Sequence, residues 1–120
     1  MIELMTDLPD NVVGFTASGE VSGDDYEDVL IPAMEEKLEE YDKIRALYYF
    51  SDEFEEFEGD ALWDDARVGM KHLTDFEKIA VVCDRKWIRR SIKAFGWLMP
   101  GEVKLYNNSE LDEAKAWVSE

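Results

Sequence analysis

The sequence has one cysteine, Cys83, and only 13 Lys and Arg residues against 29 Asp and Glu residues. A single cysteine excludes an intrachain disulfide and any zinc site built from several cysteines. The formal net charge of −16 disfavours nucleic-acid binding, because most of the surface would repel a phosphate backbone. We therefore expect no nucleic-acid partner, and the low cysteine content suits a reducing cytoplasm.

Long apolar runs are also missing. None approaches the roughly 20 residues that a membrane-spanning helix needs. No basic stretch precedes an apolar run at the start, where Glu3 and Asp7 interrupt the sequence, so no signal peptide is predicted. With 46% hydrophobic residues in 120, the chain can bury one core. We predict a single domain over residues 1–120, located in the cytoplasm or peripherally at the inner face of the membrane.

Strand and helix patterns alternate along the chain. Apolar runs or period-2 alternation predict strands at 2–8, 12–21, 44–50, 78–83 and 102–106, and helical spacing predicts helices at 22–41, 60–73, 85–96 and from 109 onward. Pro32 lies inside the first helix, so we expect a kink or two abutting helices there. This order predicts an α/β fold with a mixed, mostly parallel sheet of about five strands, an antiparallel N-terminal edge strand and about four helices.

The helix starts carry capping signals. Ser22 with Asp25, and Ser109 with Asp112, have the spacing of a capping box, and Asp60 and Asp84 are predicted to cap the two helices between them. Residues 51–60, "SDEFEEFEGD", contain six acids and are interpreted as a loop.

Basic residues concentrate in residues 84–101, "DRKWIRRSIKAFGWLMPG", which hold five of the 13. On a helix, four of these cations (Lys86, Arg89, Arg90 and Lys93) fall on one face with Arg85 at its edge, opposite Trp87, Ile88, Ile92 and Phe95. One interpretation is an ordinary helix with a solvated basic face. The other adds Trp97, Leu98 and Met99, because apolar tips beside cations predict contact with an anionic membrane or a partner. In the competing interpretation Trp97 and Met99 fold back over the sheet edge.

Two further features indicate a ligand. Arg85 and Lys86 occupy the first turn of the predicted helix, where the helix dipole disfavours cations, and a bound anionic head group would relieve this. Apolar side chains before and within this segment predict a pocket lined by Phe54, Phe57, Leu62, Trp63, Met70, Trp87 and Phe95.

Catalytic and metal-binding patterns are weak. His72, the only histidine, has no Ser or Cys partner at motif spacing, and Asp65 lies about 10 Å from it along a helix, too far to share one metal. Cys83 ends a predicted buried strand, which favours an inert core thiol. Residues 52–60 lack the spacing of an EF-hand. We expect no enzymatic activity, no metal and no cofactor.

Three segments carry a family resemblance: "DYEDVLIPAMEE" (25–36), "LWDDARVGMKHLTDFEKIAVVCDRKW" (62–87) and "PGEVKLYNNSELDEAKAWV" (100–118). They resemble the SpoIIAA-like family of small bacterial proteins, within the STAS domains (sulfate transporter and anti-sigma factor antagonist). The resemblance implies a mixed sheet with packed helices and a relation to lipid-transfer domains of the CRAL-TRIO type. The phosphorylatable serine loop of anti-sigma antagonists is not matched: Ser51 is the only hydroxyl in residues 51–60, and the surrounding acids would repel a phosphate.

These observations predict a binding module for a small lipophilic or anionic ligand, with or without peripheral membrane association. The alternative is a protein–protein regulator of the anti-sigma-antagonist kind that acts without phosphorylation. Homodimerisation through residues 95–99 would produce the same apolar signal.

Overall fold

The computed structural model describes residues 1–59, 67, 71, 74–96 and 101–120. Their strands form one sheet in the order β1 (Ile2–Leu4), β2 (Val12–Val21), β3 (Ile44–Phe57), β4 (Phe76–Val82) and β5 (Glu102–Tyr106). β1 is antiparallel to β2, and every other neighbouring pair is parallel. The predicted α/β class and the antiparallel edge strand are confirmed.

The first helical segment changes its winding at the proline. Ser22 and Asp25 form the predicted capping box at α1 (Gly23–Asp25), which continues into a π-helical turn, η1 (Tyr26–Leu30), and then α2 (Ile31–Glu40). The backbone N–H of Ile31 donates to Tyr26 O, five residues back. Since Pro32 has no N–H to donate, the irregularity falls next to it, as predicted.

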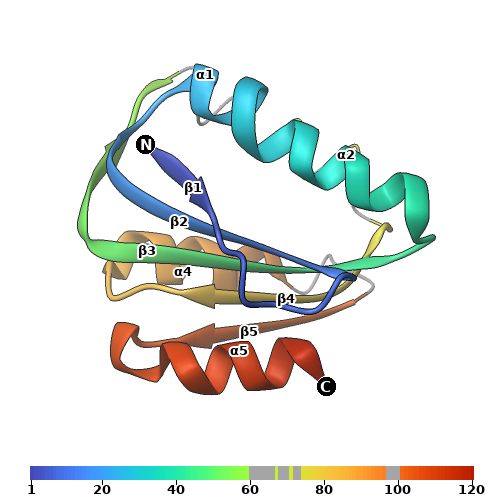
Figure 1. Ribbon diagram of the computed structural model, residues 1–120. Coiled ribbons are helices and arrows are strands. Elements are labelled where there is room, and N and C mark those ends of the chain that lie inside the picture. The colour runs from blue at the N-terminus through green and yellow to red at the C-terminus, as the bar shows by residue number, and fades with distance from the viewer. Residues whose placement is uncertain (60–66, 68–70, 72–73, 97–100) are drawn as a thin grey trace.

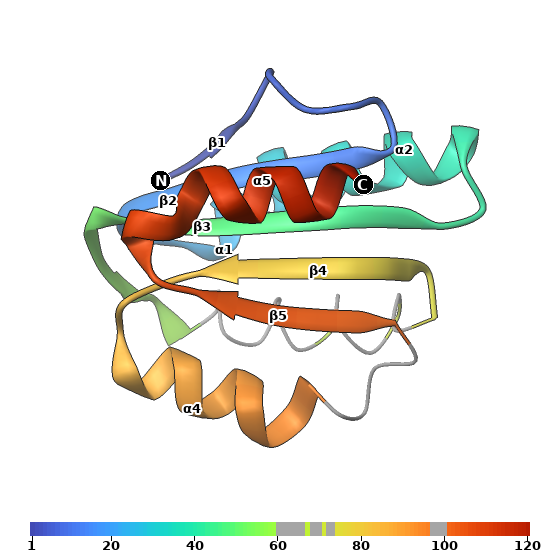
Figure 2. The ribbon, with the colours of Figure 1, turned by 90° about the horizontal axis from the view of Figure 1, so that it is seen from below.

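The remaining described helices are α4 (Lys86–Phe95), a 3-10 turn η3 (Asn108–Glu110) and α5 (Leu111–Ser119). The helix predicted at 60–73 lies largely outside the described residues. Because β2 to β5 follow one another in parallel, right-handed connections place the intervening helices on one face of the sheet. α1, α2 and α4 lie on that face and α5 on the other (Figures 1 and 2).

Each face of the sheet has its own core. The larger core joins α2 and α4 to the sheet and includes Phe15, Tyr26, Met34, Ile44, Phe50, Phe54 and Ile88. The smaller one lies under α5 and includes Val12, Leu47, Ala80, Val82, Ala114, Trp117 and Val118. Adjacent residues such as Val12 and Val13, or Val81 and Val82, enter opposite cores, because side chains alternate across a strand.

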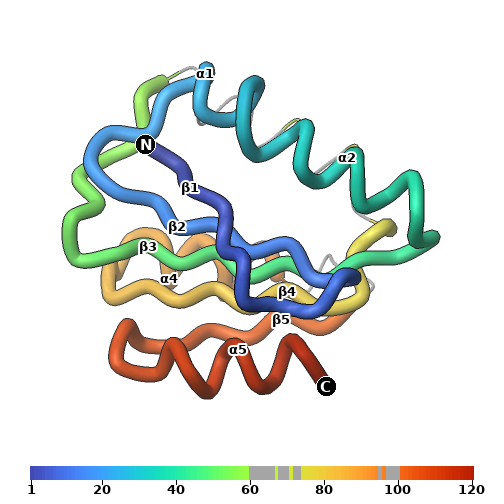
Figure 3. Tube along the Cα trace, viewed as in Figure 1, coloured from blue at the N-terminus to red at the C-terminus, as the bar shows by residue number. Residues whose placement is uncertain are grey.

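The predicted loop at 51–60 is wrong over most of its length, since β3 continues to Phe57. Its outer half pairs with the end of β2, where Phe54 faces Gly19 and Phe57 faces Val21. The register shifts beside Gly19, whose φ of +59° is readily adopted by glycine. Burial of Phe54 and Phe57 outweighs the surrounding acids, and the paired ends of β2 and β3 curve together toward α1 (Figure 3).

Two predicted caps are also wrong. α4 begins after Arg85, which has no side-chain capping bond, and Asp84 instead accepts the backbone N–H of Asn108 at 3.0 Å. The last helical segment is capped by Asn107 and Glu110 rather than by Ser109 and Asp112. Asp84 is instead used by the segment after β5, and the 3-10 turn begins the last helical segment two residues earlier than predicted.

Candidate functional site

A row of aromatic side chains, which we call the aromatic row, leads from the larger core to the surface. Its members are Tyr48, Phe50, Phe54, Phe57 and Trp87. Successive ring centroids are 4.4, 5.0, 5.2 and 6.0 Å apart, all contacts after the first being close to edge-on. Phe54 is 1% exposed, whereas Trp87 at the outer end is 49% exposed. The row therefore ends in a large apolar surface that a ligand can reach.

The last two rings of the row come from different elements. Phe57 is half-buried at the tip of β3, and Trp87 lies in the first turn of α4. The helical pattern placed Trp87 with Ile88 and Ile92 on the buried face. Ile88 is buried and Ile92 half-buried, but Trp87 points outward and contacts Phe57 with its ring. Phe54, Phe57 and Trp87, which were predicted to lie close together, are successive members of the row.

The five cations of the basic segment have different surroundings. Arg85 donates to the carbonyl oxygen of Phe54, and its guanidinium lies 5.6 Å from the centre of the Phe54 ring. Arg89 donates to Cys83 O at 2.9 Å and Tyr106 O at 3.0 Å, so it joins the carboxyl ends of β4 and β5. Arg89 is therefore occupied by the fold and is not part of an exposed basic face.

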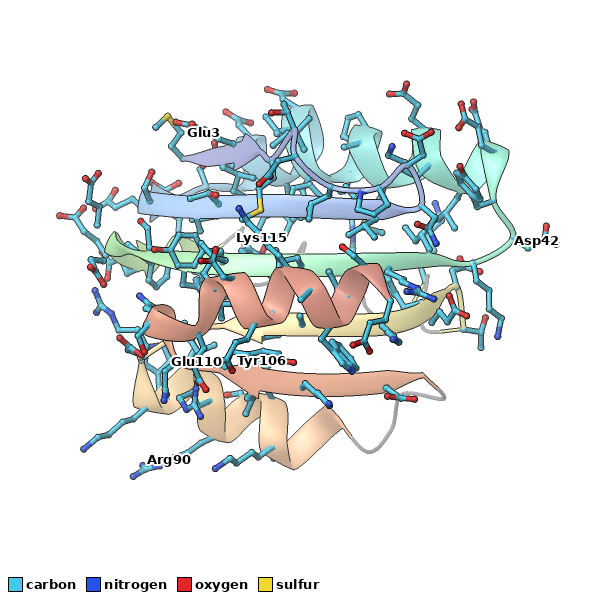
Figure 4. All side chains as sticks on the ribbon, turned by 60° about the horizontal axis from the view of Figure 1, so that its bottom comes forward. Glu3, Asp42, Arg90, Tyr106, Glu110 and Lys115 are labelled. Atoms are coloured by element: carbon cyan, nitrogen blue, oxygen red, sulfur yellow. The ribbon has the colours of Figure 1, made fainter. Side chains whose placement is uncertain are left out.

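Lys86, Arg90 and Lys93 are exposed along α4. Their spacing of four and three residues places them on one helix face. Figure 4 shows Arg90 extending away from the helix. Together with Arg85, they form a local positive patch on a chain of net charge −16, and we call these four residues the α4 cations.

Cys83 is buried beneath the start of α4, and its sulfur accepts the backbone N–H of Arg85 at 3.3 Å. Burial raises the pKa of the Cys83 thiol above its ordinary value, so the neutral form dominates at neutral pH. The predicted core role is consistent with this position. Within the described part of the chain, no three His, Cys, Asp or Glu side chains gather as metal ligands would.

Ser51 lies within β3 and is held by the sheet. Its hydroxyl donates to Ala17 O at 3.1 Å and accepts the backbone N–H of Glu53 at 3.3 Å. The hydroxyl is therefore tied to the paired strands rather than presented at the start of a helix.

Several predicted site residues fall outside the described residues, namely Leu62, Trp63, Met70, Trp97, Leu98 and Met99, as does the side chain of Phe95. His72, Asp64 and Asp65 fall outside as well. The proposed pocket under the aromatic row and the proposed membrane loop therefore stay predictions. No helix in the described ranges is long and apolar enough to cross a membrane.

One surface feature was missed by sequence reasoning. An open hollow of about 300 Å³ lies between α4 and β5, lined by Ile92, Lys93, Gly96, Val103 and Leu105. The alternation of Val103 and Leu105 with charged residues indicated that both side chains share one face of β5. The position of α4 over that face could not be read from the pattern.

Comparison with known proteins identifies the fold. The model of the family described as SpoIIAA-like matches residues 12–119. A solved structure of an uncharacterized protein from the DUF3478 family with a SpoIIAA-like fold, from Shewanella loihica PV-4, is 26% identical, with a TM-score of 0.77 over 98% of this chain and 92% of that chain. No curated protein matches the chain. The chain belongs to the SpoIIAA-like family.

Proposed function

From this SpoIIAA-like fold we propose a non-enzymatic binding module for amphipathic anions, such as the lipids of an anionic membrane surface. The apolar part of the ligand packs against Phe57 and Trp87 at the outer end of the aromatic row. The anionic head group lies beside the α4 cations. The single observation that carries this proposal is the 49% exposure of Trp87 next to Phe57 and three exposed cations.

Charge supports the choice of ligand. A chain of net charge −16 repels anions at long range, so a site for an anion needs cations gathered locally. Exposed Trp beside Lys and Arg suits the interface between head groups and acyl chains, where each cation contributes about 1 kcal/mol near an anionic surface. The tight packing of Phe54 and Phe57 holds the outer ring of the row in place.

The test is flotation with vesicles. Wild-type protein is mixed at low salt with vesicles of phosphatidylglycerol and phosphatidylcholine, and in parallel with vesicles of phosphatidylcholine alone. We expect binding to the anionic vesicles that falls with added salt, and at least a fivefold loss for Arg90→Glu and for Trp87→Ala. A soluble single-chain alkyl phosphate, monitored by tryptophan fluorescence, distinguishes binding of free amphiphiles from binding of a membrane.

The matched control is Lys43→Glu, which changes the net charge by the same amount at an exposed position in the turn before β3. It should bind vesicles like the wild type. If the wild type binds neither vesicles nor the alkyl phosphate, or if Arg90→Glu binds as well as Lys43→Glu, the proposal is wrong.

A protein–protein regulator is the second candidate, and one observation favours it. The outer half of β3 exposes Glu53, Glu55 and Glu56 on a paired strand, which suits a basic protein surface. The hydrogen bonds of Ser51 favour a mode of action without phosphorylation. In this case, charge reversal at Glu55 rather than at Arg90 removes the interaction.

A further inference from the structure

β5 is the last strand of the sheet and has a neighbour, β4, on one side (Figure 2). Tyr106 O accepts the backbone N–H of Cys83 at 3.0 Å, so the peptide groups of Tyr106 face β4. Because the hydrogen-bonding direction alternates along a strand, the backbone N–H and C=O groups of Val103 and Leu105 face away from β4. Among the described residues no strand pairs with this outer side.

An open strand edge is a template for pairing with another chain, and its side chains decide which chain fits. Glu102 and Lys104 are exposed, carry opposite charges and lie two residues apart on one face of β5. Val103 and Leu105 lie on the other face, where they line the hollow beside α4. The edge therefore combines one charged face with one apolar face.

We propose that β5 pairs with β5 of a second copy, antiparallel, about a two-fold axis at Val103. In this register Val103 and the partner's Val103 exchange backbone hydrogen bonds. Glu102 lies opposite the partner's Lys104, and Lys104 opposite the partner's Glu102. Directly opposed residues approach to about 5 Å between Cβ atoms, where opposite charges stabilise the pairing.

The charges select this register over its neighbour. A two-fold axis at Lys104 would place two lysines directly opposite each other, which is unfavourable. The axis at Val103 also brings the two hollows beside α4 to the same face of a continuous ten-stranded sheet. The surface is thus self-complementary, as an interface between identical copies must be.

Long-range repulsion works against this dimer, since each copy has a net charge of −16. Added salt screens that repulsion over distances beyond about 10 Å at 0.1 M, while the contacts across the strand pair are much shorter. We therefore expect dimerisation to strengthen between very low salt and about 0.1 M salt. This salt dependence is opposite to that expected for binding to anionic vesicles, so the two proposals are separable.

The test is sedimentation velocity over a range of protein concentrations at about 0.1 M salt. The wild type should dimerise, and Glu102→Lys or Lys104→Glu should each weaken the dimer about tenfold, because each single reversal opposes like charges twice across the axis. The double variant Glu102→Lys/Lys104→Glu restores opposite charges and should recover dimerisation. Circular dichroism checks that each variant folds.

Two control variants, Asp42→Lys and Lys43→Glu, make the same charge changes as Glu102→Lys and Lys104→Glu. They lie in the turn between α2 and β3, where Figure 4 labels Asp42. They should sediment like the wild type. The proposal is overturned if the wild type stays monomeric at all concentrations and salt levels, in which case Glu102 and Lys104 protect the edge against pairing. It is equally overturned if the double variant dimerises no better than the single ones.

Discussion

Trp87 and Trp117 both lie beside cations, yet they have opposite roles in the structure. Trp117 packs under α5 with 9% exposure, and the amino groups of Lys78 and Lys104 each lie 4.9 Å from the centre of its ring. Lys78 also donates to Trp117 O at 3.2 Å. Trp87 is 49% exposed, and the neighbouring cations Lys86 and Arg90 point into solvent.

The difference shows that a tryptophan beside cations is not in itself a binding site. Around Trp117 both cations lie over the ring, and Lys78 also donates to a backbone carbonyl, so the ring is enclosed within the fold. Around Trp87 the ring contacts one aromatic ring among the described residues, that of Phe57, and the neighbouring cations are exposed. Exposure, rather than residue type, distinguishes the surroundings of Trp87 from those of Trp117.

The largest expected effect is on the free energy of unfolding, and it is measured by truncating each tryptophan in turn. Trp117→Ala should lower the free energy of unfolding by about 3–5 kcal/mol, because it leaves a cavity under α5. Trp87→Ala should lower it by about 1 kcal/mol or less, since the ring is largely solvated already. Urea denaturation followed by circular dichroism measures both.

One outcome would break this comparison. Equal destabilisation by both variants would mean that Trp87 is a structural residue and would weaken the proposed site. If Trp117→Ala does not fold, Lys78→Met removes a cation above the same ring and a hydrogen bond, and should still cost more than Trp87→Ala.

A second contrast separates two neighbouring arginines. Arg89→Met should destabilise the fold by about 1.5–3 kcal/mol, because it removes hydrogen bonds from a charged group to Cys83 O and Tyr106 O. Arg90→Met should stay within about 0.5 kcal/mol of the wild type, since Arg90 is exposed. In the vesicle assay we expect Arg90→Met to lose more binding than Arg89→Met, because Arg90 belongs to the α4 cations and Arg89 does not. If Arg90→Met unfolded as readily as Arg89→Met, the basic face would be part of the fold.

Local patterns predicted the fold because they depend on neighbours in sequence. The boundaries of β2, the capping box of Ser22 and Asp25 and the irregularity at Pro32 follow from alternation, side-chain reach and a missing N–H. The extension of β3 was missed because six acids hide the two buried rings. The burial of Phe54 depends on the facing strand and on Arg85, which lie far away in sequence.

The site was predictable only as a set of residue types. The interleaved cations and rings of residues 84–101 led to the prediction of a site in this segment, and that site stays a prediction. Periodicity could not distinguish Arg89 from Arg90, because the acceptors of Arg89 are carbonyls at the ends of β4 and β5. Periodicity also placed Trp87 on the buried face, since helical spacing carries no information about its contact with Phe57 on β3.

The smallest expected effect concerns Tyr106, whose charged neighbours are acids rather than the cations found beside Trp87. Tyr106 lies at the end of β5 near Glu110 (Figure 4), and its pKa is raised above 10 by burial and by the negative charges of Glu113, Glu110 and Glu120. A raised pKa in the folded state contributes stability that is fully present below about pH 10 and is lost as the pH rises through the folded value. Tyr106→Phe should therefore lose less stability than the wild type above pH 10. In an absorbance titration at alkaline pH, it should lack one late-ionising phenol. If the missing phenol were instead one that ionises near pH 10, the neighbouring acids would not act on Tyr106, and the contrast with the cationic surface of α4 would then rest on exposure alone.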